Sequence, residues 1–417
     1  MKTNQLQKNI PTGWKETKII EIADPNIMWS FTGGPFGSNL KQDSYTESGV
    51  RIIQLQNIGD GKFLDNYKIY TSEEKAKELL SCNIYPGEII LSKMGDPVAR
   101  ACIIPNISDK YLMASDGIRL SVNKEKYNNY YVFLAINSGY FRKLAERSST
   151  GSTRKRIGLV DLKKLRLLTP NLLEQNRIVQ VLETWDKYLE KLDQKTKIKK
   201  KNKKGLMQNL LTGKVKLGVS DKKWQLIKIG DIGEIITGNT PPMNNIDNYE
   251  GQYCWATAED FNGKYIFDTK IKLSEKGKNV SRFLPKGSIL VTCIASIGKN
   301  AIAGIPLATN QQINSIIVNN KNNSEFIYYI IQNSNNLLKK YAGTGGIPIL
   351  NKITFSNIKI HIPCNIEEQT AIANILMTAD REIDELEKQR KIIMEQKKYL
   401  LNNLLTGQIR LPEFIKN

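Results

Sequence analysis

The feature that most constrains the fold is an internal repeat. Residues 203–213 read KKGLMQNLLTG and residues 397–407 read KKYLLNNLLTG, so eight of eleven aligned letters are identical at an offset of 194. An ordered series of matches is not expected from chance similarity of Lys- and Leu-rich sequence, so we interpret the chain as a duplication. The match continues upstream at the same offset, pairing Glu174-Gln175 with Glu368-Gln369, Ile178 with Ile372, Leu182 with Leu376, Asp186 with Asp380, and Leu192 with Leu386.

The regions upstream of these segments match more loosely. Trp14 stands near the start of one and Trp224 near the start of the other, and residues 86–91 are echoed by residues 285–290. The ends of the repeat agree in register while the middles diverge. We therefore expect a symmetric scaffold that carries two different globular parts.

Two long helices are predicted at about 172–211 and 366–405. Neither stretch contains proline, and Gly205 is their only glycine. Apolar residues recur at steps of three and four, which is typical of the contact face of a helix pair. At about 40 residues, each helix would be roughly 60 Å long and would hold the globular parts apart. The apolar residues include Leu182, Trp185, Leu189, Leu192, Leu206 and Leu210 in the first helix, and Leu376, Ala379, Ile383, Leu386, Ile393, Leu400 and Leu404 in the second.

Charged residues interrupt this apolar face at Lys199 and Lys203 in one helix and at Arg390 and Lys397 in the other. Such interruptions favour an antiparallel pair with a partly hydrated middle, although each helix could instead pack only on its own domain. Gly213 and Gly407 are expected to end the helices in the left-handed conformation. Nine lysines lie between residues 187 and 204, and they could follow DNA phosphates or simply face water.

The globular parts are predicted to be α+β. Short β-like runs alternate with turn residues, and helical stretches intervene at about 130–147 and 325–340. The expected organisation is a first domain at 1–168, a central helix at 169–215, a second domain at 216–362 and a C-terminal helix at 363–417. The predicted strands include residues 50–55, 88–91, 118–122, 288–291 and 314–318.

The net charge of +20 and the pI of about 9.5 suggest a polyanionic partner, most commonly nucleic acid. The alternatives are a solubility surface or the residue bias of an AT-rich genome. Five scattered cysteines without a Cys-x-x-Cys pattern are typical of reduced thiols. The N-terminus lacks the apolar segment of a signal peptide and no apolar run approaches membrane-spanning length, so a cytoplasmic protein without a membrane partner is expected.

Polar residues beside the predicted strands are candidates for DNA contacts. Arginine and lysine pair with guanine or phosphate, and asparagine and glutamine pair with adenine in the major groove. Surface amides are common in this composition, so each residue alone is a weak signal. The candidates are Arg51, Gln54, Gln56, Asn57, Lys93, Arg100, Arg154, Lys155 and Arg156 in the first half, and Thr240, Lys299, Asn310, Gln311 and Gln312 in the second.

Motifs of catalysis are not found in the sequence. His361 has no second histidine for a triad or a metal site, and Gly298-Lys299-Asn300 does not complete a phosphate-binding loop. Thr240-Pro241-Pro242-Met243 departs at both ends from the adenine-methyltransferase signature. We therefore expect no catalytic residue, no metal and no cofactor in this chain.

The order Gly34-Pro35-Phe36-Gly37-Ser38, then 86–92, then Pro170 followed by Glu174-Gln175 and a long helix resembles the specificity (S) subunits of type I restriction–modification systems. Both halves carry the resemblance, which covers essentially the whole chain. The second half departs from it by replacing the Gly-Pro-Phe-Gly loop with residues 238–242. The two domains should therefore recognise different sequences.

The resemblance implies two target recognition domains on double-stranded DNA, each contacting one half of a bipartite site. It implies that the helices form an antiparallel spacer that binds two methyltransferase (M) subunits, which restriction (R) subunits join when present. S-adenosylmethionine would bind the M subunit. A free-standing repressor and a single-chain nuclease stay as alternatives. The residues expected to bind the M subunits are Glu174, Gln175, Leu206, Leu210, Glu368, Gln369, Leu400 and Leu404.

Overall fold

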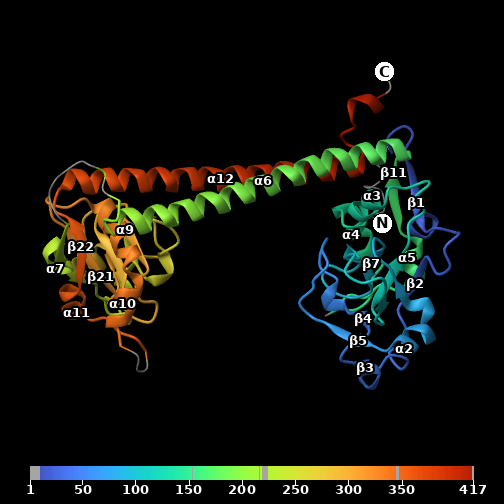
Figure 1. Ribbon diagram of the computed structural model, residues 1–417, viewed down its shortest axis with the longest axis horizontal. Coiled ribbons are helices and arrows are strands. Elements are labelled where there is room, and N and C mark those ends of the chain that lie inside the picture. Colours follow the sequence, from blue (N-terminus) through green and yellow to red (C-terminus); the bar gives the residue numbers. More distant parts are fainter. Residues whose placement is uncertain (1–9, 153, 216, 218–223, 344–346, 416–417) are drawn as a thin grey trace. The chain divides into compact units, whose positions relative to one another are not determined.

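The computed structural model describes residues 10–152, 154–215, 217, 224–343 and 347–415. Its contacts divide the chain into two compact units. Unit 1 consists of residues 1–191 and 390–417, and unit 2 consists of residues 192–389. Each unit thus combines one globular part with a portion of both long helices, α6 and α12 (Figure 1).

The long helices have nearly the predicted bounds, since α6 spans Leu172–Leu210 and α12 spans Ile366–Thr406. An asparagine precedes each, and its side-chain oxygen accepts a hydrogen bond from an amide of the first turn: Asn171 from Glu174 and Asn365 from Glu367, both at 2.9 Å. Such capping satisfies amides that lack a partner within the helix. Gly213 and Gly407 have φ of 70° and 67°, which confirms the prediction for the helix ends.

Unit 1 contains three sheets, in the strand orders β1-β11, β2-β10-β7-β8 and β3-β5-β4-β9-β6. All of their pairings are antiparallel except β4 with β9. The strands are β1 Lys15–Lys18, β2 Phe31–Gly33, β3 Tyr45–Thr46, β4 Val50–Ile53, β5 Ile69–Thr71, β6 Asn83–Ile84, β7 Ile89–Ser92, β8 Ala101–Ile103, β9 Tyr111–Met113, β10 Gly117–Leu120 and β11 Arg166–Thr169. The shorter helices are α1 Ile19–Ile22, α2 Glu73–Glu78, α3 Asn129–Ile136, α4 Gly139–Arg147 and α5 Leu159–Lys164.

Unit 2 repeats this plan with the orders β12-β22, β13-β21-β18-β19-β15 and β16-β14-β20-β17. The parallel pair β14 and β20 corresponds to β4 and β9, and unit 2 has a second parallel pair, β15 with β19. The strands are β12 Trp224–Lys228, β13 Gly233–Thr237, β14 Tyr249–Ala256, β15 Tyr265–Ile266, β16 Ile271–Leu273, β17 Phe283–Leu284, β18 Ile289–Thr292, β19 Asn300–Ala303, β20 Leu307–Thr309, β21 Ile313–Val318 and β22 Lys359–Pro363. The shorter helices are α7 Ile229–Ile232, α8 Glu275–Asn279, α9 Ser324–Asn333, α10 Asn335–Tyr341 and α11 Lys352–Asn357.

Each of the two predicted helical stretches is in fact a pair of helices. In unit 1, α3 ends before Ser138, whose hydroxyl caps α4 by accepting from the amide of Phe141. In unit 2, the equivalent break falls at Ser334, between α9 and α10. The predicted helical stretches are therefore confirmed, and each is divided at a serine, which caps the second helix through its hydroxyl only in unit 1.

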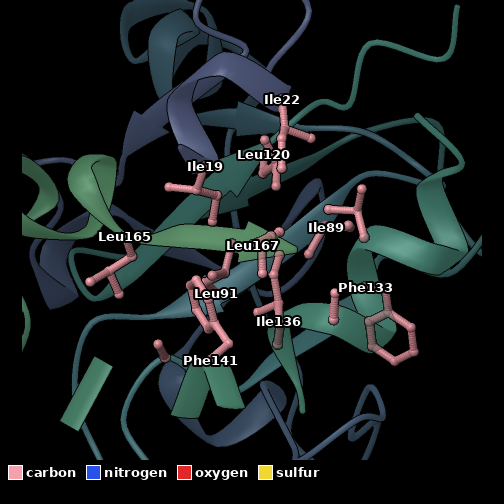
Figure 2. Packing of buried hydrophobic residues seen from close by; sticks show 14 of the residues in the cluster. Ile19, Ile22, Ile89, Leu91, Leu120, Phe133, Ile136, Phe141, Leu165 and Leu167 are labelled. Atoms are coloured by element: carbon pink, nitrogen blue, oxygen red, sulfur yellow. The ribbon is translucent and has the colours of Figure 1, made fainter. Parts of the chain in front are cut away.

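The core of unit 1 lies between the central sheet, helices α3 and α4, and the ends of both long helices. Figure 2 shows Ile89 and Leu91 of β7 near Leu120, Ile136 and Phe141. Leu404 and Leu405, at the C-terminal end of α12, belong to the same core. In unit 2 the equivalent place is filled by Leu210, the last residue of α6, and by Leu211, which follows it. The end of each long helix thus completes the core of the globular part that belongs to the other repeat.

Ion pairs show that the two long helices run antiparallel in unit 2, and an equivalent ion pair joins them in unit 1. In unit 2, Lys199 contacts Glu382 at 2.6 Å, and Lys203, further along α6, contacts Asp380, which is earlier in α12. In unit 1, Asp186 of α6 contacts Lys397 of α12. The Asp186–Lys397 and Asp380–Lys203 pairs are equivalent in the repeat, so two of the predicted interruptions of the apolar face are matched ion pairs.

The part of the chain that the structure describes offers no helix long and apolar enough to cross a membrane. Within the same residues, no group of three or more potential metal ligands occurs. His361 is exposed on β22 and its ring packs against Trp224, with the ring centroids 5.4 Å apart.

Candidate nucleic-acid interface

In unit 1, the loops that carry the candidate DNA contacts meet at one end of the sheets. Strands β2 and β7 end where the antiparallel β10 begins, as the pairing of Gly117 with Ser92 shows. The parallel strands β4 and β9 both end beside this point, where Ile53 pairs with Met113. We name the resulting surface the unit 1 edge. It comprises residues 34–40, 54–57, 93–100, 114–116, 150–152 and 154–156.

Backbone hydrogen bonds join these loops. The amide of Lys93 donates to the carbonyl of Asp116 at 2.7 Å, and the amide of Ile157 donates to the carbonyl of Lys93 at 2.9 Å. The amide of Gly95 donates to the carbonyl of Lys155 at 3.2 Å. The segment with the three consecutive basic residues is therefore attached directly to the loop that follows β7.

Two candidates of the first half are buried and bonded within the unit. Asn57 has no exposed surface, and its side-chain amide donates to the carbonyls of Leu64 and Tyr67 at 2.9 and 2.8 Å. Arg51 is 4% exposed and pairs with Asp65, and this arginine lowers the pKa of the Asp65 carboxyl. Both side chains support the fold around β4, and neither presents a free group to DNA in this structure.

Lys93 and Arg100 lie at the unit 1 edge but also bind backbone carbonyls. The Lys93 ammonium donates to the carbonyl of Ser115 at 2.8 Å, and burial lowers its pKa. Arg100 donates to the carbonyls of Ile58 and Leu55, the second at 3.1 Å. Both cations thus fix the loops while adding positive charge to the edge.

Gln54 and Gln56 are accessible to a ligand. Gln56 is exposed and donates to the side chain of Gln54 at 3.2 Å. Gln54 lines a cavity of about 210 Å³ together with Phe36, which is 82% exposed, and Asp116. An aromatic side chain and an amide at one hollow can contact a nucleic-acid base.

The three basic residues after α4 are the most accessible cations of the edge. Arg154 is exposed. Arg156 pairs with Asp116 at 3.2 Å and Lys155 pairs with Glu146, while both basic side chains stay about half exposed, at 54% and 42%. Exposed ion pairs of this kind are weak and can be exchanged for phosphate contacts.

Unit 2 builds an equivalent surface from equivalent bonds, and we name it the unit 2 edge. The amide of Cys293 donates to the carbonyl of Gln312 at 2.7 Å, and the amide of Leu350 donates to the carbonyl of Cys293 at 2.8 Å. The amide of Ala295 donates to the carbonyl of Pro348 at 3.1 Å. These bonds match those of Lys93, Ile157 and Gly95 in unit 1. The unit 2 edge comprises residues 238–244, 257–260, 293–299, 310–312, 343 and 347–350.

The candidates of the second half gather at this edge. The Thr240 hydroxyl and the Gln311 side chain are hydrogen-bonded to each other, and Gln312 is partly exposed beside them. Lys299 is exposed at the end of the β18–β19 hairpin, where Arg100 stands in unit 1. Asn310 is only 8% exposed, and its side-chain oxygen accepts from the amide of Gln312 at 3.1 Å, so it mainly shapes the turn.

Sequence reasoning missed several exposed apolar side chains at these edges. Phe36 is visible in the Gly-Pro-Phe-Gly motif, but it was not among the candidates. Met243, Ile347 and Ile349 are 77%, 69% and 54% exposed at the unit 2 edge. Ile347 and Ile349 could have been found from their place in the repeat, because residues 347–349 are equivalent to Arg154-Lys155-Arg156.

The Glu-Gln pairs that open the long helices have internal partners. Gln175 accepts from the amide of Asn128 at 2.9 Å and donates to the carbonyl of Pro170 at 2.8 Å. Gln369 makes the same bonds to Asn323 and Pro363, at 2.8 and 2.9 Å. Both glutamines are at most 1% exposed, so they tie each helix to its globular part.

The glutamates beside them are also buried. Glu174 receives two hydrogen bonds from Arg410, at 3.0 and 2.7 Å, and Glu368 accepts from the indole of Trp224 at 3.1 Å. Leu210 and Leu404 are core residues, and Leu206 and Leu400 pack against those cores. The six buried side chains among these eight could influence a partner only through the helix position that they hold, whereas Leu206 and Leu400 stay partly exposed.

The comparisons with known proteins agree with this architecture. The family model described as type I restriction modification DNA specificity domain matches twice, at residues 38–200 and 221–396. A Methanocaldococcus jannaschii protein provisionally named type I restriction enzyme MjaX specificity subunit is 26% identical over 424 residues, covering 96% of this chain and 95% of the relative. The MjaIX specificity subunit of the same organism is 35% identical over 184 residues, or 42% of each chain.

Solved structures share the fold across nearly the whole chain. A chain from a structural study of the assembly of a type I restriction–modification system aligns with a TM-score of 0.66 and 17% identity, covering 96% of this chain and all of that one. The HsdS subunit of Thermoanaerobacter tengcongensis aligns with a TM-score of 0.55 and 16% identity, covering 97% and 99%. With two matches to the family model that together span most of its length, the chain belongs to the type I restriction–modification DNA specificity family.

Proposed function

We propose that the chain binds a bipartite DNA target, with the unit 1 edge on one half-site and the unit 2 edge on the other. The observation that carries this proposal is the matched construction of the two edges. The same backbone bonds hold both, while the exposed side chains at equivalent positions differ. A conserved framework with different exposed residues is what two recognition surfaces for two different sequences require.

The chemistry of the exposed residues fits double-stranded DNA. Arg154 and Lys155 at the unit 1 edge, and Lys299 at the unit 2 edge, can neutralise phosphates and give affinity that falls with salt. Gln54, Gln56 and Gln311 can reach base edges and give specificity. The chain itself performs no chemical step in this proposal, and S-adenosylmethionine is bound by a separate methyltransferase subunit.

We further propose that two methyltransferase subunits dock on the exposed faces of α6 and α12, in the cytoplasm, with restriction subunits joining them when present. A surface groove of about 460 Å³ in unit 1, lined by Trp185, Glu395, Gln396, Tyr399 and Leu400, offers an apolar contact there. Tyr399 is 65% exposed. This groove replaces the buried glutamates and glutamines as the expected contact surface.

Co-purification tests this function. The full-length chain, expressed with the methyltransferase subunit of its own system, should elute as one complex that methylates DNA at a bipartite site only when the chain is present. A Tyr399→Ser variant should lose methyltransferase subunits from the complex, while Ile107→Ala in unit 1 should not. Sequence-specific binding without a methyltransferase would favour a repressor, and cleavage by the isolated chain would favour a nuclease; either result contradicts the proposal.

A further inference from the structure

The two edges differ most in one segment, which we call the arm. In unit 1 the arm is Arg154-Lys155-Arg156, and in unit 2 it is Ile347-Pro348-Ile349. The equivalence rests on backbone pairing: Met94 forms an isolated bridge with Arg156, and Ile294 forms the corresponding bridge with Ile349. The repeat has therefore exchanged a cationic arm for an apolar one at the same position on the same loop.

The two edges as a whole also differ in charge, and the unit 2 edge is the less positive one. The unit 1 edge carries five basic residues (Lys93, Arg100, Arg154, Lys155 and Arg156) against the acids Asp96 and Asp116. Among the described residues of the unit 2 edge, Lys299 is the only basic one, against Glu259 and Asp260. One exposed arginine, Arg282, borders this edge, where its guanidinium donates to the carbonyl of Thr237 at 2.8 Å, but the described residues of the unit 2 arm carry no cation.

The residues beside the apolar arm indicate which base pairs it could contact. Gln312 and Leu350 both bond the backbone of Cys293, so the amide segment and the arm flank the same residue. Gln311 and Gln312 supply groups that pair with adenine in the major groove, where the thymine of the same base pair presents its 5-methyl group. Exposed isoleucines beside amides are thus suited to A·T pairs.

We propose that Ile347 and Ile349 contact thymine methyl groups, so that unit 2 recognises a half-site containing an A·T pair besides any pair whose adenine the methyltransferase subunit modifies. This inference rests on the proposed function, because it assumes that the unit 2 edge faces DNA. Burial of one methyl group stabilises a contact enough to change affinity about fourfold. The contact excludes water from the side chains of Ile347 and Ile349, which are 69% and 54% exposed in the free chain.

The test uses the complete complex with its methyltransferase subunits. Methylome sequencing first gives the bipartite site, and exchange of residues 1–168 identifies the half-site that belongs to unit 2. Binding is then measured on duplexes in which thymines of that half-site are replaced one at a time by deoxyuridine, which removes only the methyl group. We expect about fourfold weaker binding at one or more positions outside the methylated pair.

A double-mutant cycle assigns the effect to the arm. In the Ile347→Ala/Ile349→Ala variant, thymine and deoxyuridine duplexes should bind equally, whereas the Ile107→Ala control should keep the difference. Ile107 is 64% exposed and follows β8, at the end of the sheet opposite the unit 1 edge.

Two results would overturn the inference: a unit 2 half-site without a further A·T pair, or deoxyuridine effects that persist in the arm variant. A complex that methylates no bipartite site would instead overturn the proposed function.

Discussion

At the residue scale, burial separates side chains that hold the loops from side chains that can touch DNA. The sequence indicated part of each edge, because amides and basic residues cluster after several predicted strands, but it did not indicate residues 114–116, 257–260 or 347–350. It could not separate Gln56, which is exposed, from Asn57, which is buried one residue later. That difference depends on the carbonyls of Leu64 and Tyr67, which only the folded chain brings to the Asn57 side chain.

Replacing Asn57 should lower the stability of the protein, whereas replacing Arg154 should weaken DNA binding and leave stability nearly unchanged. Asn57→Ala leaves two buried carbonyls without their donor and should lower the free energy of unfolding by about 1–3 kcal/mol. Arg154→Ala should leave stability within about 0.5 kcal/mol and reduce the slope of log affinity against log salt by about 1 if the side chain contacts a phosphate. Denaturant unfolding and salt-dependent DNA binding measure these effects, and a stable Asn57→Ala protein would contradict the structural role.

Gln175 provides a second residue-scale prediction. Gln175→Ala removes buried bonds to Asn128 and Pro170, so the free energy of unfolding should fall by about 1–3 kcal/mol. Gln369→Ala should do the same in unit 2, because its bonds to Asn323 and Pro363 are equivalent. Gln180→Ala, an exposed position on α6, is the matched control and should change stability little. Normal stability with loss of the methyltransferase subunit would instead show a direct partner contact.

At the element scale, the long helices were predicted almost to the residue, since proline-free periodic sequence and terminal glycines define them. The predicted stretches did not locate the breaks at Ser138 and Ser334, which fall within the polar runs 137–139 and 333–336. The partners of Lys203 and Lys397 could not be predicted either. They depend on the register of the helix pair, which places each lysine against the aspartate of the other helix.

Exchanging charges tests this register. Lys203→Asp places a second carboxylate beside Asp380, which also accepts from the Tyr329 hydroxyl, whose pKa is raised by burial and by Asp380. The single variant should lose about 1–3 kcal/mol of stability, and adding Asp380→Lys should restore part of it. A double-mutant cycle by thermal or denaturant unfolding measures the coupling. If Lys203→Asp lowered the free energy of unfolding equally in the parent protein and in the Asp380→Lys variant, the ion pair would not be formed.

Helix length is expected to set the gap between half-sites. One extra turn of four residues, inserted in α6 between Asp186 and Lys203 and in α12 between Asp380 and Lys397, keeps both ion pairs in register. It adds about 6 Å, so the nonspecific spacer should lengthen by about two base pairs with both half-sites unchanged. Methylome sequencing gives the spacer directly. An unchanged spacer would show that helix length does not determine it.

At the scale of the whole molecule, the repeat predicted two different globular parts on a common scaffold, and the matched sheets confirm it. The sequence did not predict which chain segments make up each unit. Leu404 and Leu405 complete the core of unit 1, while Leu210 and Leu211 complete that of unit 2. The repeated Leu-Leu-Thr-Gly ends therefore have a packing reason that sequence alignment alone does not reveal.

The central claim is that each globular part determines one half-site independently. Its most direct measurement is methylome sequencing of cells that express a chimaera in which residues 1–168 come from a relative of known specificity, together with the methyltransferase subunit. We predict that one half-site changes to that of the relative while the other half-site and the spacer stay as in the parent protein. A change in both half-sites, or in neither, would contradict the account.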